Sequence, residues 1–148
     1  MTYETILPNL SPCGLDCTRC ADHQDGDIKY HATKLRELLE NYDRLAKIKS
    51  AEKPVFEHYQ KFEELLNNFS SAHCGGCRST DCQCPINCTL KDCQKENKVK
   101  YCYECSLFPC DNPPFPKNLR ERWLKANNRM KEIGPIEFYI EQSKLPRY

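Results

Sequence analysis

Apolar residues recur at three- and four-residue steps in the first half of the chain, with Lys, Arg and Glu between them. This spacing places apolar side chains on one face of an α-helix. It predicts an amphipathic helix of about 20 residues, for which Asp27 is a suitable N-cap. The apolar positions of this stripe are Ile28, Leu35, Leu38, Leu39, Tyr42 and Leu45.

A second helix is predicted from about Pro54, because proline fits the first turn, where its missing N–H costs nothing. Its apolar stripe ends at Phe69, after which the chain becomes polar and rich in Gly, Ser and Cys. The two stripes together predict a helical hairpin over residues 28–70. The second stripe consists of Val55, Tyr59, Phe62, Leu66 and Phe69, with Phe56 and Leu65 beside it.

The last part of the chain predicts further helices. Residues 89–98 fit one short helix that ends near Asn97, and 111–118 form a proline-rich connector. A helix over about 117–132 follows, Gly134 can end it, and Pro135 can open the next. No stretch alternates as a long β-strand would. The expected apolar positions are Leu119, Trp123, Ala126 and Met130, then Ile136, Tyr139 and Ile140.

Twelve cysteines dominate the candidate chemistry. Three pairs have two residues between them, a spacing that lets the backbone fold into a knuckle and point both sulfurs at one ion. Twelve thiolates suit three four-coordinate sites, and we expect two or three zinc ions. The predicted metal ligands are Cys13, Cys17, Cys20, Cys74, Cys77, Cys82, Cys84, Cys88, Cys93, Cys102, Cys105 and Cys110.

Several alternatives stay open for these cysteines. Cys82 and Cys84 have only one residue between them, so one of the two could be spare. Thiolate sites suit iron–sulfur clusters as well as zinc, and an even number of cysteines also permits a disulfide scaffold. His23 could complete a site with the first three cysteines, whereas His73 is more typical of a loop histidine.

No motif in the chain predicts a catalytic residue. It lacks a phosphate-binding glycine loop, an HExxH sequence and a G-x-S-x-G sequence. The pair Cys102 and Cys105 is the one redox candidate, but no helix is predicted directly after it, as a low-pKa thiolate usually requires. The sequence therefore leaves open whether the protein is an enzyme, and a structural role for this pair is favoured.

Composition and charge limit the classes of partner that we expect for this protein. The chain of 148 residues has a net charge of +1, and ligation of three Zn²⁺ ions by twelve thiolates would change this to about −5, which argues against a nucleic-acid partner. No signal peptide or membrane span is recognisable, so we expect a cytoplasmic protein that does not enter a membrane.

A protein partner is the remaining expectation, and aromatic residues in the cysteine-rich part motivate it. Residues 117–148 also carry eight Lys and Arg against four Glu, an excess that usually belongs to a solvated helix but could meet an acidic partner. The aromatic residues expected to be exposed are Tyr101, Tyr103, Phe108 and Phe115.

The cysteine motifs resemble those of an uncharacterised microbial family, domain of unknown function 3795. The opening Ser-Pro-Cys13-Gly-Leu-Asp-Cys17-Thr-Arg-Cys20 and the pair Cys74-Gly-Gly-Cys77-Arg are similar to its first hallmark. Cys88-Thr-Leu-Lys-Asp-Cys93, then Tyr101-Cys102-Tyr-Glu-Cys105-Ser-Leu-Phe-Pro-Cys110, resembles the second. The tail Arg129-Met-Lys-Glu-Ile-Gly134-Pro-Ile-Glu-Phe-Tyr139 resembles the usual ending. The resemblance implies a cysteine-ligated zinc protein and supplies no activity.

The sequence thus predicts a mainly α protein, in which a helical hairpin and C-terminal helices pack around a loop-rich metal centre ligated by cysteines. We expect one domain, 1–148, with a cysteine loop at 1–27, the hairpin at 28–70, the cysteine-rich region at 71–115 and C-terminal helices at 116–148. The predicted function is structural zinc binding in an interaction module. The alternative is an iron–sulfur or thiol redox protein that transfers electrons.

Overall fold

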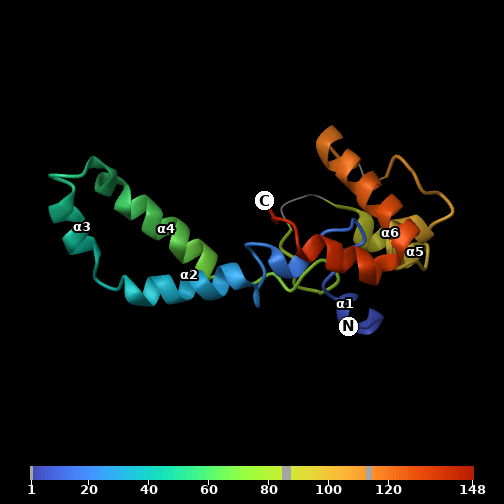
Figure 1. The fold of residues 1–148 in the computed structure, drawn as a ribbon, viewed down its shortest axis with the longest axis horizontal. Coiled ribbons are helices and arrows are strands. Elements are labelled where there is room, and N and C mark those ends of the chain that lie inside the picture. Colours follow the sequence, from blue (N-terminus) through green and yellow to red (C-terminus); the bar gives the residue numbers. More distant parts are fainter. Residues whose placement is uncertain (1, 85–87, 113–114) are drawn as a thin grey trace. The chain divides into compact units, whose positions relative to one another are not determined.

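The computed structural model describes residues 2–84, 88–112 and 115–148 (Figure 1). Within these ranges the regular structure is helical, with isolated β-bridges and no β-strand, so the mainly α prediction is confirmed. The chain divides into two compact units. We call Arg19–Cys74 the hairpin unit, and Met1–Thr18 together with Gly75–Tyr148 the cysteine unit. This division does not test the expectation of one domain, which stays a prediction.

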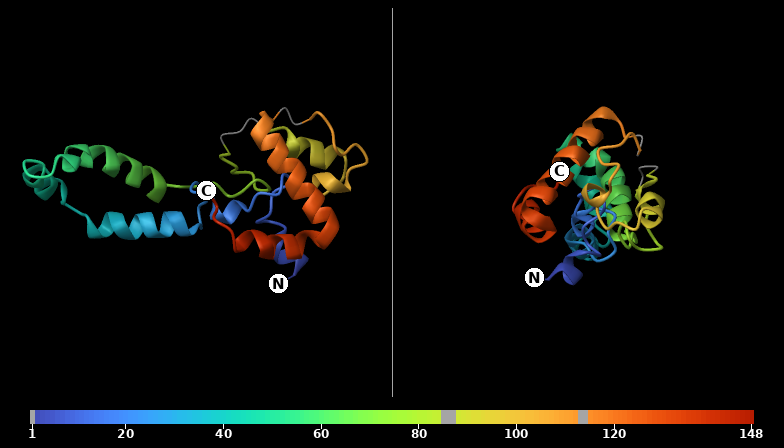
Figure 2. Two further views of the ribbon diagram at one scale, coloured as in Figure 1. Left: turned by 45° about the horizontal axis from the view of Figure 1, so that its top comes forward. Right: turned by 90° about the vertical axis from the view of Figure 1, so that its right-hand side faces the viewer.

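The hairpin unit contains three α-helices. They are α2 (Asp27–Leu38), α3 (Asp43–Lys49) and α4 (Tyr59–Ser70). Helices α2 and α4 lie side by side, and α3 lies at the end where the chain turns back (Figures 1 and 2). At the other end, the N–H of Cys74 donates to the carbonyl of Asp22 at 2.8 Å, and Gln24 donates to the carbonyl of Cys74 at 3.0 Å. The predicted hairpin is therefore confirmed, and a short β-bridge closes its base.

The prediction of one helix through Leu45 is wrong. Helix α2 ends at Leu38, and Asn41 adopts the left-handed conformation (φ 62°), which turns the chain before α3 begins. The apolar period continues across this break because the turn still directs Tyr42 inward. The ring of Tyr42 packs against Tyr59, at 5.4 Å between centroids. Periodicity alone cannot distinguish a continuous helix from two helices that share one apolar face.

The start of the second helix also differs from the prediction. Pro54 opens a 3₁₀ helix, Pro54–His58, and α4 begins only at Tyr59. The proline does occupy a first helical turn, as its missing N–H predicts. At the start of α2, the N-cap is Gly26, and Asp27 is the first helical residue. At this position the negative charge of the Asp27 carboxylate interacts favourably with the positive end of the helix dipole.

The cysteine unit contains α1 (Tyr3–Ile6), α5 (Leu90–Glu96) and α6 (Lys117–Ser143). The predicted short helix near residues 89–98 is confirmed as α5. Helix α6 bends sharply at Gly134 (Figure 2), whose φ of 81° and ψ of 159° are almost exclusive to glycine. The predicted stop at Gly134 and restart at Pro135 are thereby confirmed. No helix in the described ranges has the length and apolar character to cross a membrane.

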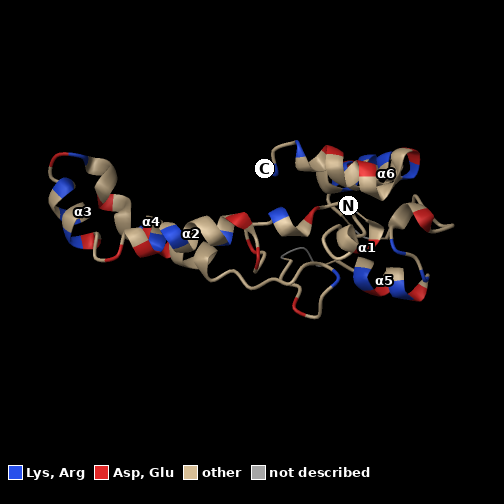
Figure 3. Ribbon diagram, turned by 60° about the horizontal axis from the view of Figure 1, so that its bottom comes forward, with Lys and Arg blue, Asp and Glu red and all other residues tan. Residues whose placement is uncertain are grey.

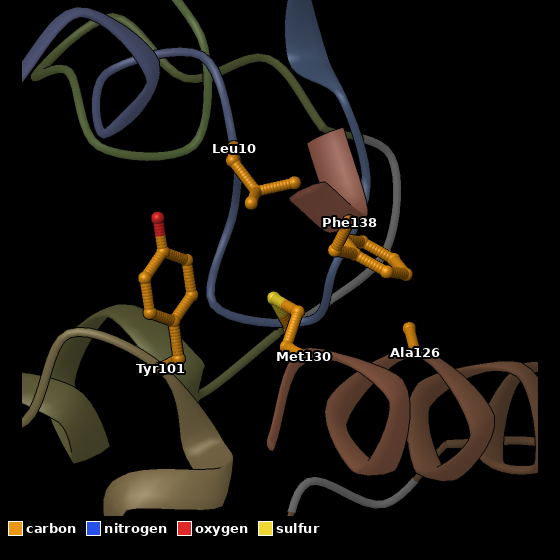
Figure 4. Packing of buried hydrophobic residues seen from close by; sticks show 5 residues of the cluster. All are labelled: Leu10, Tyr101, Ala126, Met130 and Phe138. Carbon is orange, nitrogen blue, oxygen red and sulfur yellow. The ribbon is translucent and has the colours of Figure 1, made fainter. Parts of the chain in front are cut away.

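Aromatic and aliphatic side chains from three parts of the cysteine unit form its core (Figure 4). Helix α6 supplies three of the residues, and the N-terminal loop and the segment before Cys102 supply the others. Tyr101 is fully buried there, so the expectation that it is exposed is wrong. Its ring stacks on that of Tyr103, which is half-buried. The labelled core residues are Leu10, Tyr101, Ala126, Met130 and Phe138.

Trp123 is also buried, and two further aromatic side chains cover it. The rings of Phe108 and Phe115 lie edge-on to the indole, with centroids at 5.1 and 6.3 Å. Both are half-buried, so they belong mainly to the packing of α6 and not to an exposed aromatic surface. Asn127 is fully buried one helical turn beyond Trp123, where it accepts a bond from the N–H of Tyr103 at 3.1 Å. In the sequence, the burial of Asn127 is indicated only by its position on the apolar face of α6.

Candidate metal centre

Four cysteines of the cysteine unit line one small cavity. Helix α5 supplies one, and the 3₁₀ helix Cys102–Glu104 and the loop after it supply the others. The cavity volume is about 20 Å³, enough for one water-sized sphere. We call these four residues the four-thiol set. They are Cys93, Cys102, Cys105 and Cys110.

The local structure holds two members of this set in a tight turn. The carboxylate of Glu104 accepts bonds from the N–H groups of Lys100 and Tyr101, at 2.7 and 3.0 Å. The N–H of Cys105 donates to the carbonyl of Cys102 at 3.0 Å. These bonds fold the C-x-x-C segment back on itself, which is the arrangement that a metal knuckle needs.

Polar groups surround the sulfurs of the four-thiol set. The side-chain amide of Asn97 donates to Cys93 Sγ at 3.5 Å, and the thiol of Cys110 donates to the carbonyl of Asn112 at 2.6 Å. The indole N–H of Trp123 is buried and makes no hydrogen bond of ordinary geometry with the residues that the structure describes. Burial raises the pKa of the nearby Cys102 thiol, and the indole N–H lies close enough to offset part of that rise. A thiolate at Cys102 would give this buried donor an acceptor.

Burial has the larger effect on Cys102. It raises the pKa of the Cys102 thiol to about 12, and nearby cysteines, Cys13, Cys93 and Cys110, add to the rise. Burial also raises the pKa of Cys93. These two thiols are therefore protonated at neutral pH unless a cation replaces their protons. A raised pKa is the opposite of what a nucleophilic redox cysteine requires.

A second group of cysteines gathers around Cys77 in the same unit. The N-terminal loop folds onto this segment, because the N–H of Cys77 donates to Cys17 Sγ at 3.4 Å. Cys13 lies at a tight turn, where its sulfur is 2.9 Å from the hydroxyl of Ser11. Burial raises the pKa of Cys77 well above its ordinary value, and Cys13, Cys17, Cys82 and Cys88 act in the same direction.

Two predicted ligands lie in the hairpin unit. The unit boundary falls inside two C-x-x-C pairs, since Cys20 and Cys74 belong to the hairpin unit while Cys17 and Cys77 belong to the cysteine unit. His23 is buried beside Cys74, and its Nδ1 accepts a bond from the N–H of Asp25 at 3.2 Å. His23 thus organises the loop before α2.

The remaining candidates lie at the surface. Cys84 is exposed, and His73 is exposed with its Nδ1 3.3 Å from the carbonyl of Ser71, as expected of a loop histidine. In the parts of the chain that the structure describes, there is no disulfide. Likewise, no group of three or more His, Cys, Asp or Glu side chains among residues 2–84, 88–112 and 115–148 is placed so that it could hold a metal ion as it stands. Several cysteines therefore lie near one another, but their sulfurs are not arranged as the ligand shell of an ion.

Arg78 is a residue of this region that the sequence analysis missed. Its guanidinium donates to the carbonyls of Leu10 and Lys100, at 3.0 and 2.7 Å, and to the amide oxygen of Gln94 at 2.7 Å. It also lies over the ring of Tyr101, 5.1 Å from the centroid. Arg78 follows Cys77 directly, and its three bonds reach the segments that carry Leu10 and the four-thiol set. Its position next to a C-x-x-C pair is the only sequence signal.

The family of the chain follows from comparison with known proteins. The model of the family described as "Protein of unknown function (DUF3795)" matches residues 9–113, a range that includes all twelve cysteines. No curated protein and no solved structure matches the chain. Because the match covers well over half of the 148 residues, the chain belongs to the DUF3795 family of proteins of unknown function.

Proposed function

We propose that the protein binds zinc through the four-thiol set and that the ion stabilises the fold of the cysteine unit. The observation that supports this most directly is the shared cavity, into which α5 and the loop after Tyr101 bring four thiols. The buried indole N–H of Trp123 beside Cys102 is a donor suited to a thiolate. Twelve cysteines in 148 residues are compatible with metal binding.

A structural role suits this donor set better than a catalytic one. Four cysteine ligands complete the tetrahedral shell that structural zinc sites prefer, so no position is left for water or substrate. Zinc would replace the protons of buried thiols, and its binding would be coupled to folding of the unit. A reducing compartment such as the cytoplasm would keep the thiols available for the metal.

An iron–sulfur cluster is the alternative, because it uses the same thiolate ligands. A thiol redox function of Cys102 and Cys105 has weaker support, since burial raises the pKa of Cys102 to about 12. Elemental analysis and visible absorption of anaerobically purified protein separate these possibilities. Zinc without visible absorption supports the proposal. Iron together with a brown colour would favour the iron–sulfur cluster over zinc. A folded protein that contains no metal would refute both proposals.

Variants of the cysteines assign the site. We expect the double substitution Cys102→Ser with Cys105→Ser to lower the zinc content by one ion per chain. The matched control is Lys95→Gln with Glu96→Gln, which changes two exposed residues of α5 that do not line the cavity and keeps the net charge. It should leave this ion in place. Equal zinc content in wild type and the double variant would show that the four-thiol set does not hold the ion.

We further propose that the hairpin unit is the part of this module that contacts a protein partner. The aromatic residues first expected to do so are half-buried or buried, whereas the hairpin unit exposes eight large apolar side chains. Leu38 is 82% exposed and Ile48 is 72% exposed, so most of each side chain is available for contact with a partner. The exposed residues are Tyr30, Leu35, Leu38, Leu45, Ile48, Val55, Phe62 and Leu65.

Paired substitutions test this role. A partner captured by the wild-type protein should be lost with Leu38→Gln and Ile48→Gln. It should be kept by the control with Glu37→Gln and Lys47→Gln, two exposed residues of the same unit. Equal capture by both double variants, or capture by neither, would contradict an apolar contact through the hairpin unit.

A further inference from the structure

The bend of α6 creates a groove within the cysteine unit that is separate from the four-thiol set. Its walls come from both sides of Gly134, with Arg122, Lys125 and Arg129 before the bend and Glu141 and Gln142 after it. The groove volume is about 630 Å³, within the range of sites that bind small molecules. It lies almost entirely outside residues 9–113, the range that the family model matches.

Apolar side chains line part of the groove. Phe138 and Ala126, both buried core residues, contribute to it, and Leu145 contributes from beyond the end of α6. Phe138 is only 2% exposed and forms a fixed floor of the groove, whereas Leu145 is 54% exposed and offers more apolar surface to a ligand. This part of the groove suits the apolar body of a ligand.

The charged side chains of the groove are unevenly paired. Arg129 bonds to both carboxylate oxygens of Glu141, at 2.6 and 3.1 Å, and to Glu132 at 3.1 Å. Both acidic residues of the groove are therefore paired with one arginine. The side chains of Arg122 and Lys125 make no ion pair or hydrogen bond with any residue that the structure describes. Figure 3 shows the basic residues of α6 in blue.

Arg122 and Lys125 are three residues apart, so they lie on the same face of α6. Two positive charges beside an apolar surface are complementary to an anion that carries an apolar body. A carboxylate can accept two bonds from a guanidinium, and an ammonium can add a third. We propose that this groove binds an organic carboxylate with an apolar body, its charged end at Arg122 and Lys125 and its body against Leu145, over the floor that Ala126 and Phe138 form.

Nuclear magnetic resonance titration of the zinc-loaded full chain tests the proposal. The probe is 4-phenylbutyrate, and saturable shifts of backbone amides along the groove are the expected result. The neutral 4-phenylbutanamide and acetate, which has no apolar body, should each bind about tenfold more weakly or worse. An acetyl-Gly-Gly-Phe peptide with a free carboxylate serves as a second probe. Tighter binding of the peptide would identify a peptide C-terminus as the source of the carboxylate, and tighter binding of phenylbutyrate a small molecule.

Charge-matched variants complete the test. Arg122→Gln with Lys125→Gln should weaken phenylbutyrate binding about tenfold or more. Lys117→Gln with Lys131→Gln removes the same net charge from exposed positions of α6 outside the groove and should leave the affinity unchanged. Absence of saturable shifts, equal binding of the acid and its amide, or equal loss in both variants would overturn the proposal. Zinc content is measured separately, so a protein without zinc that still binds phenylbutyrate would refute only the metal proposal.

Discussion

The two units of the chain bury very different side chains. The cysteine unit places Trp123, Tyr101, Phe138 and Met130 in its interior, each 2% exposed or less. The buried apolar residues of the hairpin unit are small except for one leucine, and its larger apolar side chains stay exposed. They are Ala32, Ala46, Leu66, Ala72 and Cys74. A broad apolar stripe on two paired helices exceeds what those helices can cover for each other.

This contrast suggests two sources of stability. In the described part of the cysteine unit, α1, α5 and α6 are separated by segments with little regular structure, so a bound metal ion would add stability that the helices alone do not provide. The hairpin unit has nearly continuous helices, and we expect them to persist without an ion. The following experiments test that difference, beginning with the largest expected effect.

Metal removal should separate the two units most clearly. Chelation at neutral pH should unfold the cysteine unit, because it removes the free energy of zinc binding, about 10 kcal/mol or more, and the protonated thiols that remain do not replace it. The hairpin unit should keep its helices. Hydrogen exchange of the chelated protein checks this, with fast exchange expected for α5 and slow exchange for α2 and α4. Protection that stays unchanged in both units after proven metal loss would remove the distinction between them.

Substitutions to alanine should show where the chain depends on its cores. Trp123→Ala should cost about 3–5 kcal/mol, because it leaves a cavity under Phe108 and Phe115. Leu66→Ala should cost about 2–3 kcal/mol in the hairpin unit, where it is 6% exposed. The control Leu38→Ala, at an 82% exposed position, should stay within about 0.5 kcal/mol of wild type.

Denaturant unfolding followed by circular dichroism measures these changes. A cost for Leu38→Ala as large as that for Leu66→Ala would mean that the exposed stripe of the hairpin unit is covered within the chain. In that case the proposed partner surface would lose its main support.

Two glycines of the cysteine unit distinguish close packing from backbone conformation. Both have positive φ, at 85° for Gly14 and 81° for Gly134. A Cβ at Gly14 would lie 2.5 Å from the Cβ of Ala126, whereas one at Gly134 would meet nothing within 4 Å. Gly14→Ala should therefore cost about 3 kcal/mol and Gly134→Ala about 1–2 kcal/mol, as lowered free energies of unfolding. The reverse order would show that the N-terminal loop does not pack tightly on α6.

The smallest predicted effect compares one left-handed residue in each unit. Lys98 has φ 55° after α5, and Asn41 has φ 62° after α2. Asparagine adopts this conformation more readily than lysine. Lys98→Gly should stabilise the cysteine unit by about 0.5–1 kcal/mol, and Asn41→Gly should change the hairpin unit by a few tenths. Chemical denaturation of each variant measures the difference, and equal gains at both positions would contradict it.

The sequence predicted the helices well where local signals agree. The helix stop at Gly134 could be predicted because glycine tolerates positive φ. Helix α5 could be predicted because a short helical segment is followed by a polar residue, Asn97. It failed at Asn41, because an apolar stripe continues across a turn whenever both helices face the same neighbour. It also missed α1 and Arg78, whose importance comes from contacts with distant segments.

By itself, the sequence determined a helical protein with a cysteine content that suits metal ligands, and it determined where glycine and proline interrupt the helices. Only the tertiary structure decided that Cys93 shares a cavity with Cys102, Cys105 and Cys110, and that Tyr101 is buried. The physical reason is range. Spacing along the chain fixes which neighbours a residue meets within a few positions, whereas the companions of a thiol or an aromatic ring depend on how α5, α6 and the N-terminal loop pack together.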